Sequence, residues 1–377
     1  LGLARSMVEG RGYEFNHERH TKYTPGFPAM LAAAGAAFSP PDTLSDSFLA
    51  YNVTVTLLGA GVLALFYYLL REMDLSPGAF TAIFVLLLFC RTLHYYSTHI
   101  MTDVPFTFFA MAALLLGFWT LHRNGWQSWA ACVGAGLMIL AASSIRPVGP
   151  LLLPAITGGI WLRRGVRNEW KGRLGRTVLL WALLMVPLLT YSRWTHGVTG
   201  DTDLGYHYFR GRLEPARLVR FLRRGLARGG DHFDGITDAL MGTDMGTAVG
   251  VLLAVLMAVG LVVSLRRHER QLSLFALLVI SVIPFGGWAL DRRYLLPAIP
   301  GMYCWLVLGS ITTGRFLRDR WRFWNDRRLG WLAGIGIGIV LVVNLLRIGD
   351  IVLEQRGDFY SEIEDGLLQD YARGLDW

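Results

Sequence analysis

The chain has 377 residues, of which 53% are hydrophobic and 17% are charged. Soluble domains carry about 25% charged residues, so this composition excludes an ordinary soluble enzyme and indicates a protein that crosses the membrane several times. The net charge is +8, but the basic residues mostly border apolar segments, as membrane topology requires. Nucleic acid is therefore not an expected partner. The three cysteines lie in apolar runs and imply no disulfide framework.

The first 26 residues are polar to amphipathic and lead into a bend at Lys22–Pro28. Two prolines around Gly26 fix this bend and remove backbone donors, so no continuous helix is expected through it. The apolar run Phe27–Phe38 has 12 residues and is shorter than the roughly 20 residues that span a bilayer. We expect it to form a helix that lies at the interface or packs re-entrantly.

Ten apolar segments follow, and each is predicted to be a transmembrane helix. They lie at residues 46–70, 77–92, 104–121, 126–143, 147–162, 177–194, 247–265, 272–290, 294–312 and 329–348. The fourth and fifth segments are separated only by Ser144–Pro147, so they form a close pair with a break between them. The sequence thus predicts an all-α fold, a polytopic transmembrane helical bundle over residues 1–348.

Three regions outside the spans complete the predicted organisation. The first outer loop, residues 1–45, carries the interfacial helices, and a long hydrophilic loop occupies residues 196–246. Within the long loop, apolar residues alternate with arginines over Leu213–Leu226, a pattern typical of an amphipathic interfacial helix. A short acidic tail, residues 349–377, follows the last span and is expected to be extracytoplasmic.

The distribution of charge predicts the orientation of the bundle. With residues 1–26 outside, the inner loops hold 17 Lys and Arg against 6 Asp and Glu, whereas the rest of the chain holds 19 against 22. The basic blocks 163–176 and 315–328 then face the cytoplasm, as the positive-inside rule requires. Because ten spans leave both ends outside, one further span is expected before Leu1.

Asp103 is the first candidate for chemistry, because an ionisable residue at the boundary of a span is costly to keep there. It lies between an aromatic-rich loop and the predicted span that begins at Val104, ahead of Pro105. Two readings remain open. The carboxylate could act in a reaction, or Thr102 or Asp103 could cap the helix by accepting from free backbone N–H groups.

A His/Glu cluster in the first loop is the candidate metal site. His17, Glu18 and His20 offer nitrogen and oxygen donors at a spacing that could hold a divalent metal. The alternative is that they are surface residues of a polar loop. No other cofactor is predicted.

Basic residues at the predicted outer boundary are more informative than those in the inner loops, because they oppose the positive-inside bias. Arg146 lies in the break before Pro147, and Arg292, Arg293 and Tyr294 open another span. Guanidinium groups clamp phosphate bidentately, so these residues suit an anionic lipid head group such as a polyprenyl phosphate, with Lys22 as a further point charge. The alternative is that each arginine snorkels from a helix end.

Aromatic neighbours complete the set of candidates. His94 and His99 flank Tyr95 and Tyr96 in an outer loop, where they could bind a substrate or serve as interfacial residues. The candidate substrate-binding residues are Lys22, Tyr23, His99, Arg146, Arg292, Arg293 and Tyr294. No glycine-rich phosphate loop, serine nucleophile elbow or HExxH motif occurs, so nucleotide-driven chemistry is not supported.

Four segments, in this order and over most of the chain, resemble the GT-C class of polyprenyl-phosphate-dependent glycosyltransferases, the protein mannosyltransferase and lipid A aminoarabinose transferase-like superfamily. Lys22–Pro28 is similar to the family's Tyr-x-x-Pro-Pro-Gly segment, and Thr102–Pro105 opens a span after an aromatic loop. Ser144–Pro150 precedes Leu151–Pro154, and Arg292–Pro297 is similar to the family's Arg-Tyr-Leu-Leu-Pro run.

This resemblance implies transfer of a sugar from a polyprenyl-phosphate-linked donor to a glycan, lipid or protein acceptor, at the outer face of the bacterial inner membrane. It implies an acidic residue early in the first outer loop, at a position that would fall just before Leu1. Asp103 matches the family's second acidic position, and Arg292 to Tyr294 match the region expected near the donor phosphate.

Two other functions remain as alternatives. A secondary transporter or lipid flippase would need internal repeats or paired broken helices at the bilayer midplane, and the sequence shows no clear repeat. A non-catalytic membrane subunit is the second alternative.

Overall fold

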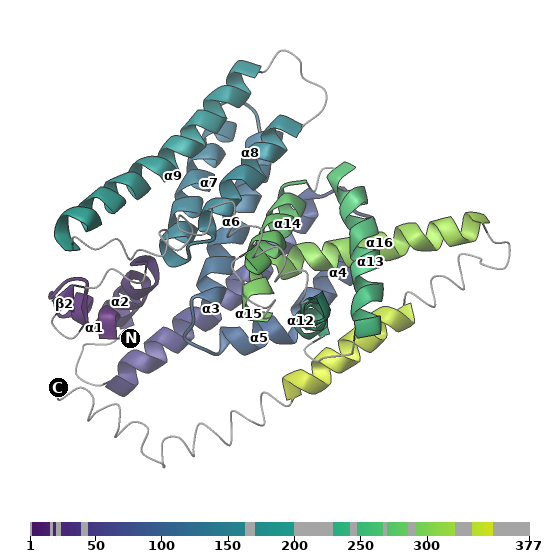
Figure 1. Cartoon of the computed structure of the whole chain (residues 1–377), viewed down its shortest axis with the longest axis horizontal. Coiled ribbons are helices and arrows are strands. Elements are labelled where there is room, and N and C mark those ends of the chain that lie inside the picture. Colours follow the sequence, from purple (N-terminus) through teal and green to yellow (C-terminus); the bar gives the residue numbers. More distant parts are fainter. Residues whose placement is uncertain are drawn as a thin grey trace.

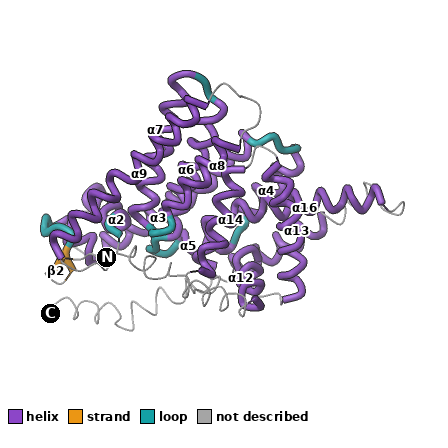
Figure 2. Tube along the Cα trace, turned by 45° about the horizontal axis from the view of Figure 1, so that its top comes forward, coloured by secondary structure: helices purple, strands orange, loops and turns teal. Residues whose placement is uncertain are grey.

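The predicted all-α architecture is confirmed by the computed structural model. It describes residues 2–15, 18–19, 24–38, 44–162, 170–199, 229–241, 247–266, 270–285, 292–320 and 334–349. Within these ranges the strands are the two-residue β1 (Glu14–Phe15) and β2 (Glu18–Arg19), which pair as one antiparallel hairpin. Figure 2 shows this hairpin near the N-terminus of an otherwise helical chain.

The first loop forms a small helical unit beside the bundle. It contains α1 (Gly2–Val8), the hairpin and α2 (Gly26–Phe38), and it lies near the start of α3 (Leu44–Glu72) in Figure 1. The short helix predicted at Phe27–Phe38 is confirmed. It begins at Gly26, so the end of the proline bend forms its first turn. Ala4 of α1 and Leu31, Ala32 and Ala34 of α2 form a separate apolar cluster with Tyr51 of α3, which attaches the unit to the bundle.

Six helices in the described part of the chain are long and apolar enough to cross a membrane, so the chain is an integral, multi-pass membrane protein. They are α3, α6 (Asp103–His122), α7 (Gly125–Ile145), α9 (Trp170–Thr199), α13 (Thr247–Arg266) and α16 (Ile299–Arg320). Each contains or overlaps one of the ten predicted spans.

The span predicted at 77–92 is a broken helix. It consists of α4 (Pro77–Leu88) and α5 (Arg91–Ser97), which are bent by 42° at the break. No proline or glycine occupies the break. The backbone N–H of Arg91, which begins α5, donates to Asn344 Oδ1 at 3.0 Å, so a buried side chain from a distant helix satisfies it.

For three predicted spans the described helix is shorter than the predicted segment, and residues 286–290 and 329–333 of two of them lie outside the described residues. The segment 147–162 forms the 3-10 turn η1 (Gly149–Leu151) and α8 (Leu152–Leu162). The segment 272–290 forms α14 (Arg270–Phe285), and 329–348 corresponds to the helix Gly334–Gly349. The predicted amphipathic helix at 213–226 and the acidic tail from residue 350 lie outside the described residues.

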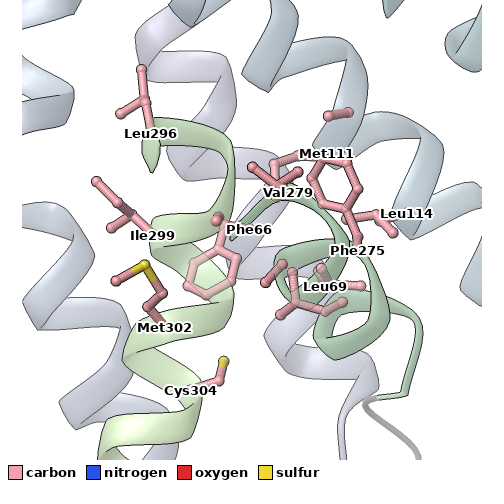
Figure 3. Packing of buried hydrophobic residues seen from close by; sticks show 14 of the residues in the cluster. Phe66, Leu69, Met111, Leu114, Phe275, Val279, Leu296, Ile299, Met302 and Cys304 are labelled. Carbon is pink, nitrogen blue, oxygen red and sulfur yellow. The ribbon is translucent and has the colours of Figure 1, made fainter. Parts of the chain in front are cut away.

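The core is organised around α16. Of the six long helices, α16 is the most enclosed, with 83% of its apolar window buried, whereas α9 has 11% buried and runs along the outer edge in Figure 1. Figure 3 shows side chains from several helices meeting in one cluster. They include Phe66 and Leu69 of α3, Met111 and Leu114 of α6, Phe275 and Val279 of α14, Leu296 of the 3-10 turn η2 (Leu296–Ala298), and Ile299, Met302 and Cys304 of α16.

Two glycines allow α13 and α16 to cross with their backbones in contact. A Cβ atom on Gly309 would lie 1.9 Å from the carbonyl oxygen of Leu256, and one on Gly260 would lie 1.8 Å from that of Trp305. Small residues permit such close approach between helices in a membrane, where packing replaces the hydrophobic effect as the main attraction. Trp305 is then placed so that its Nε1 donates to Ser273 Oγ at 2.9 Å.

We therefore expect Gly309→Ala to lower the stability of the bundle by about 1–3 kcal/mol, because the added methyl group must push the two backbones apart. Thermal unfolding in detergent, followed by tryptophan fluorescence, measures the change. Gly336→Ala is the matched control, because a Cβ at Gly336 meets nothing within 4 Å. Equal melting temperatures for the two variants would contradict the backbone contact.

Candidate functional site

The break between α7 and α8 places Arg146 at the end of a long helix. The backbone N–H of Arg146 makes the last helical bond, to Ala142 O at 3.0 Å. Its backbone is extended, with φ −139° and ψ 141°, because the residue before a proline is kept out of the helical region. The sequence Arg-Pro thus ends α7 and turns the Arg146 side chain away from the helix axis.

Asp103 at the start of α6 meets this arginine. Arg146 Nη1 donates to Asp103 Oδ1 at 2.5 Å, and the exposed fractions of the two side chains are 14% and 5%. Thr102 holds the N-cap position of α6 without a side-chain capping bond. The carboxylate is therefore engaged in a charge-assisted bond between two helices. Burial of both charges requires that each neutralise the other.

Aromatic rings hold the Arg146 guanidinium in place. Its Cζ lies 5.9 Å from the ring centre of Phe106 on α6 and 5.3 Å from that of Tyr294 on α15 (Arg292–Leu295). Stacking of a guanidinium on aromatic faces is a cation–π arrangement that fixes the plane of the group. Three separate segments of the chain, α6, the end of α7 and α15, therefore contribute to one cluster.

Arg293 places a second cation against the ring of Tyr294. Its Cζ lies 4.5 Å from the ring centre of Tyr294, and its Nη2 donates to the Tyr294 hydroxyl at 2.6 Å. Arg293 is exposed but close enough to interact electrostatically with Asp103. The polar members of the cluster are Asp103, Arg146, Arg293 and Tyr294. They carry two positive charges and one negative charge, so the cluster has an excess positive charge at its exposed edge. That charge is suited to an anion.

The proline bend of the first loop docks beside Arg146. Thr24 Oγ1 donates to the carbonyl oxygen of Ile145 at 2.9 Å. A Cβ atom on Gly26 would lie 2.6 Å from the backbone carbonyl atoms of Ser144. Glycine is thus needed at this position, because the helix α2 begins in direct contact with the last turn of α7. The bend therefore fixes the residues that immediately precede Arg146.

Not all predicted site residues are brought into this cluster. His99 hydrogen-bonds through Nδ1 to Tyr95 O at 2.6 Å and stacks on the Tyr95 ring at 4.3 Å, so it packs back on the end of α5. The side chain of Arg292 lies outside the described part of the structure, as do Lys22 and Tyr23.

The predicted metal ligands cannot be placed either. His17, His20 and the side chain of Glu18 lie outside the described part of the chain. Among the described residues, no group of three or more His, Cys, Asp or Glu side chains could hold a metal ion.

Phe106 was not predicted from the sequence, and Thr24 was predicted only as part of the Lys22–Pro28 bend, with no role of its own. Phe106 lies three residues after Asp103, so helical spacing alone places both side chains on neighbouring positions of one face and could have revealed it. The partner of Thr24 is 121 residues away along the chain, and no local pattern indicates such a contact.

Comparison with known proteins finds a family model that matches the region containing Asp103 and Arg146, and solved structures with a similar fold. Residues 35–195, which include Asp103 and Arg146, match the sequence model of the family described as dolichyl-phosphate-mannose-protein mannosyltransferase. No curated protein sequence matches the chain significantly.

Two crystal structures of ArnT from Cupriavidus metallidurans are similar to the chain. The structure bound to undecaprenyl phosphate has a TM-score of 0.58 and 14% identity, covering 90% of this chain and 57% of ArnT. The apo structure has a TM-score of 0.55 and 11% identity, covering 93% and 69%. The chain thus spans 57% of the ArnT chain in the first structure. At such identity the likeness establishes the fold, and this fold agrees with the predicted resemblance to the GT-C class.

The buried pair gives a testable energetic signature. We expect Arg146→Met or Asp103→Leu alone to destabilise the protein by about 3–5 kcal/mol, because each leaves one buried charge without its partner. The double variant should lose much less than the sum of the two, which a double-mutant cycle of denaturation free energies measures.

A surface pair serves as the control for this cycle. Arg318 and Asp319 are 3.0 Å apart, with side chains 40% and 68% exposed. Removing that pair should change the stability by no more than about 1 kcal/mol. Additive effects of the Asp103 and Arg146 substitutions would contradict a coupled buried pair.

Proposed function

We propose that the protein is a membrane glycosyltransferase that moves a sugar from a polyprenyl-phosphate-linked donor to an acceptor. One observation carries the proposal: the Asp103–Arg146 ion pair, at 2.5 Å, lies beside Arg293 and Tyr294, so a carboxylate and an excess positive charge occupy one end of the bundle. The ArnT structure of similar fold contains undecaprenyl phosphate, which supports a lipid phosphate as the donor's leaving group.

The chemistry needs these two kinds of group. The acceptor hydroxyl attacks the anomeric carbon, the bond from that carbon to the phosphate oxygen breaks, and the lipid phosphate leaves with the electron pair. The negative charge that develops on the leaving phosphate is stabilised by cations fixed in advance. We assign this role to Arg293, with the Tyr294 hydroxyl as a donor held in place by its bond from the same arginine.

Asp103 is assigned to the acceptor side of the reaction. Arg146 holds Oδ1 of Asp103, and we assign the second carboxylate oxygen, Oδ2, to the acceptor hydroxyl, whose proton it orients or accepts. The Phe106 and Tyr294 rings keep Arg146, and through it the carboxylate, in one orientation. Arg146 therefore acts as a positioning residue for Asp103.

We further propose that the site lies on the extracytoplasmic side of a bacterial inner membrane. The site is formed where α6 begins and α7 ends, whereas the described part of the basic block 163–176 is the first two turns of α9, which pack against the start of α7. Under the positive-inside rule that block faces the cytoplasm, so the site faces the opposite side. His17, Glu18 and His20 stay our candidates for a divalent metal in the first loop.

The proposal is tested by sugar transfer in proteoliposomes. Polyprenyl-phosphate-linked pentoses and hexoses serve as donors, a membrane extract supplies acceptors, and the release of polyprenyl phosphate is measured with and without EDTA. Asp103→Asn and Arg293→Gln should each lower the rate by about 100-fold or more, since each removes a charge aimed at the reacting groups. Arg318→Gln, an exposed cation near the far end of α16, is the control.

Two results would contradict the proposal. One is full transfer activity of a correctly folded Asp103→Asn protein, which would remove Asp103 from the reaction. The other is movement of the intact lipid-linked sugar across the membrane without release of polyprenyl phosphate, which would identify a flippase.

The docking of the first loop gives a separate prediction. We expect Gly26→Ala to lower kcat/KM by about 10-fold to 100-fold, because the new methyl group displaces the α7 end that carries Arg146, and displacements near 1 Å cost up to about 100-fold. Gly78→Ala is the matched control, since a Cβ there meets nothing within 4 Å. Adding Ser144→Ala to Gly26→Ala should not restore activity, because the clash is with backbone atoms as well as the Ser144 hydroxyl.

A further inference from the structure

A second cluster of aromatic and basic residues lies at the opposite end of α7 from Arg146. Four tryptophans gather where α7 begins, α8 ends and α9 begins, and their exposed fractions are 77%, 41%, 47% and 54%. They are Trp126, Trp129, Trp161 and Trp170. The end of α8 and the start of α9 lie together at the top of Figure 1. We call this region the tryptophan surface.

Contacts between the helices show that Trp129 and Trp161 both pack against the start of α9. Trp161 Nε1, at the end of α8, donates to Thr177 Oγ1 on α9 at 3.1 Å. Trp129 on α7 lies so close to α9 that a Cβ on Gly175 would be 3.0 Å from its ring. The Cys132 thiol donates to the carbonyl oxygen of Arg176 at 3.6 Å. The first two turns of α9 are therefore fixed against both neighbouring helices.

Cations are interleaved with the rings. The Arg176 guanidinium lies 5.7 Å from the ring centre of Trp129, and the Lys171 ammonium lies 6.0 Å from that of Trp170. The Nε atom of Arg176 is buried and makes no hydrogen bond within the described residues. Residues 163–176 contain six basic residues and one acidic residue. The surface thus offers positive charge at Lys171 and Arg176, while the Arg176 Nε atom itself is enclosed by its neighbours.

The position of the surface indicates what covers it. The 21 residues of α7 span about 30 Å at 1.5 Å per residue, which is the thickness of the hydrocarbon core of a bilayer. The tryptophan surface and the Asp103–Arg146 site therefore belong to opposite leaflets. Tryptophan rings favour the level of the lipid head groups, and basic pockets between transmembrane helices on the cytoplasmic side bind anionic head groups.

We propose that the tryptophan surface binds an anionic phospholipid by its head group. The phosphate lies between Arg176 and Lys171, and accepts a hydrogen bond from the Arg176 guanidinium. The rings of Trp129 and Trp161 lie along the glycerol and upper acyl region. This site is distinct from the donor site and does not depend on the proposed transferase activity.

The full chain is placed in nanodiscs of equal parts phosphatidylglycerol and phosphatidylcholine, and part of the lipid is then removed. Native mass spectrometry measures how much of each lipid stays bound to the protein. The unmodified protein should retain phosphatidylglycerol preferentially. In the variant Lys171→Gln/Arg173→Gln/Arg176→Gln, the ratio of retained phosphatidylglycerol to phosphatidylcholine should fall at least about fivefold, since ionic contacts near the surface dominate head-group selection. Inorganic phosphate alone should cause no thermal shift, whereas phosphatidylglycerol should raise the melting temperature.

A matched triple variant removes the same charge elsewhere. Arg71→Gln/Arg266→Gln/Arg320→Gln changes three exposed arginines at the ends of α3, α13 and α16, and it should keep the preference. Equal loss in both triple variants, or no preference in the unmodified protein, would overturn the proposal. Because Arg176 also packs against Trp129, the single variant Lys171→Gln, whose side chain is exposed, provides a folded variant that should show a partial loss. An unchanged preference in that variant would equally count against the site.

Discussion

The buried ion pair between Asp103 and Arg146 is the constraint on which this end of the bundle depends. Each group lies at a helix end, where α6 begins and α7 stops, and each is nearly enclosed. A charge in such a place is tolerated only when its partner is held within bonding distance. Pro147 supplies the extended backbone that lets Arg146 leave its helix, and the rings of Phe106 and Tyr294 fix the guanidinium.

The same pair links parts of the chain that are distant in sequence. Tyr294 comes from α15, which leads through the buried turn η2 (Leu296–Ala298) into α16, the most enclosed long helix. Packing of α16 in the core therefore also sets the position of Tyr294 and Arg293. The first loop contacts the end of α7, where the Thr24 hydroxyl donates a hydrogen bond to the carbonyl oxygen of Ile145. A fold similar to that of ArnT thus assembles a charged cluster from three separated segments and packs the first loop beside it, while the tryptophan surface occupies the other end of α7.

Much of this arrangement could be predicted from the sequence, because the signals are local. Apolar segments predicted the long helices, and the Arg146-Pro147 step predicted the break after α7. The bend between α4 and α5 could not be predicted, since no breaking residue marks it and its N–H partner is Asn344, 253 residues away. The docking of Gly26 on Ser144 was missed for the same reason. The sequence predicts that Asp103, Arg146 and Arg293 lie at the same membrane boundary. That Arg146 Nη1 comes within 2.5 Å of Asp103 Oδ1 depends on tertiary packing and could not be predicted.

The most direct measurement of the central claim is an experimental structure of the chain in nanodiscs with undecaprenyl phosphate, determined by electron cryo-microscopy. The account predicts that the phosphate lies within hydrogen-bonding distance of Arg293 and Tyr294, with the Asp103–Arg146 pair intact beside it and its second carboxylate oxygen facing the phosphate side. A phosphate bound away from these residues, or Asp103 and Arg146 separated in the complex, would contradict it.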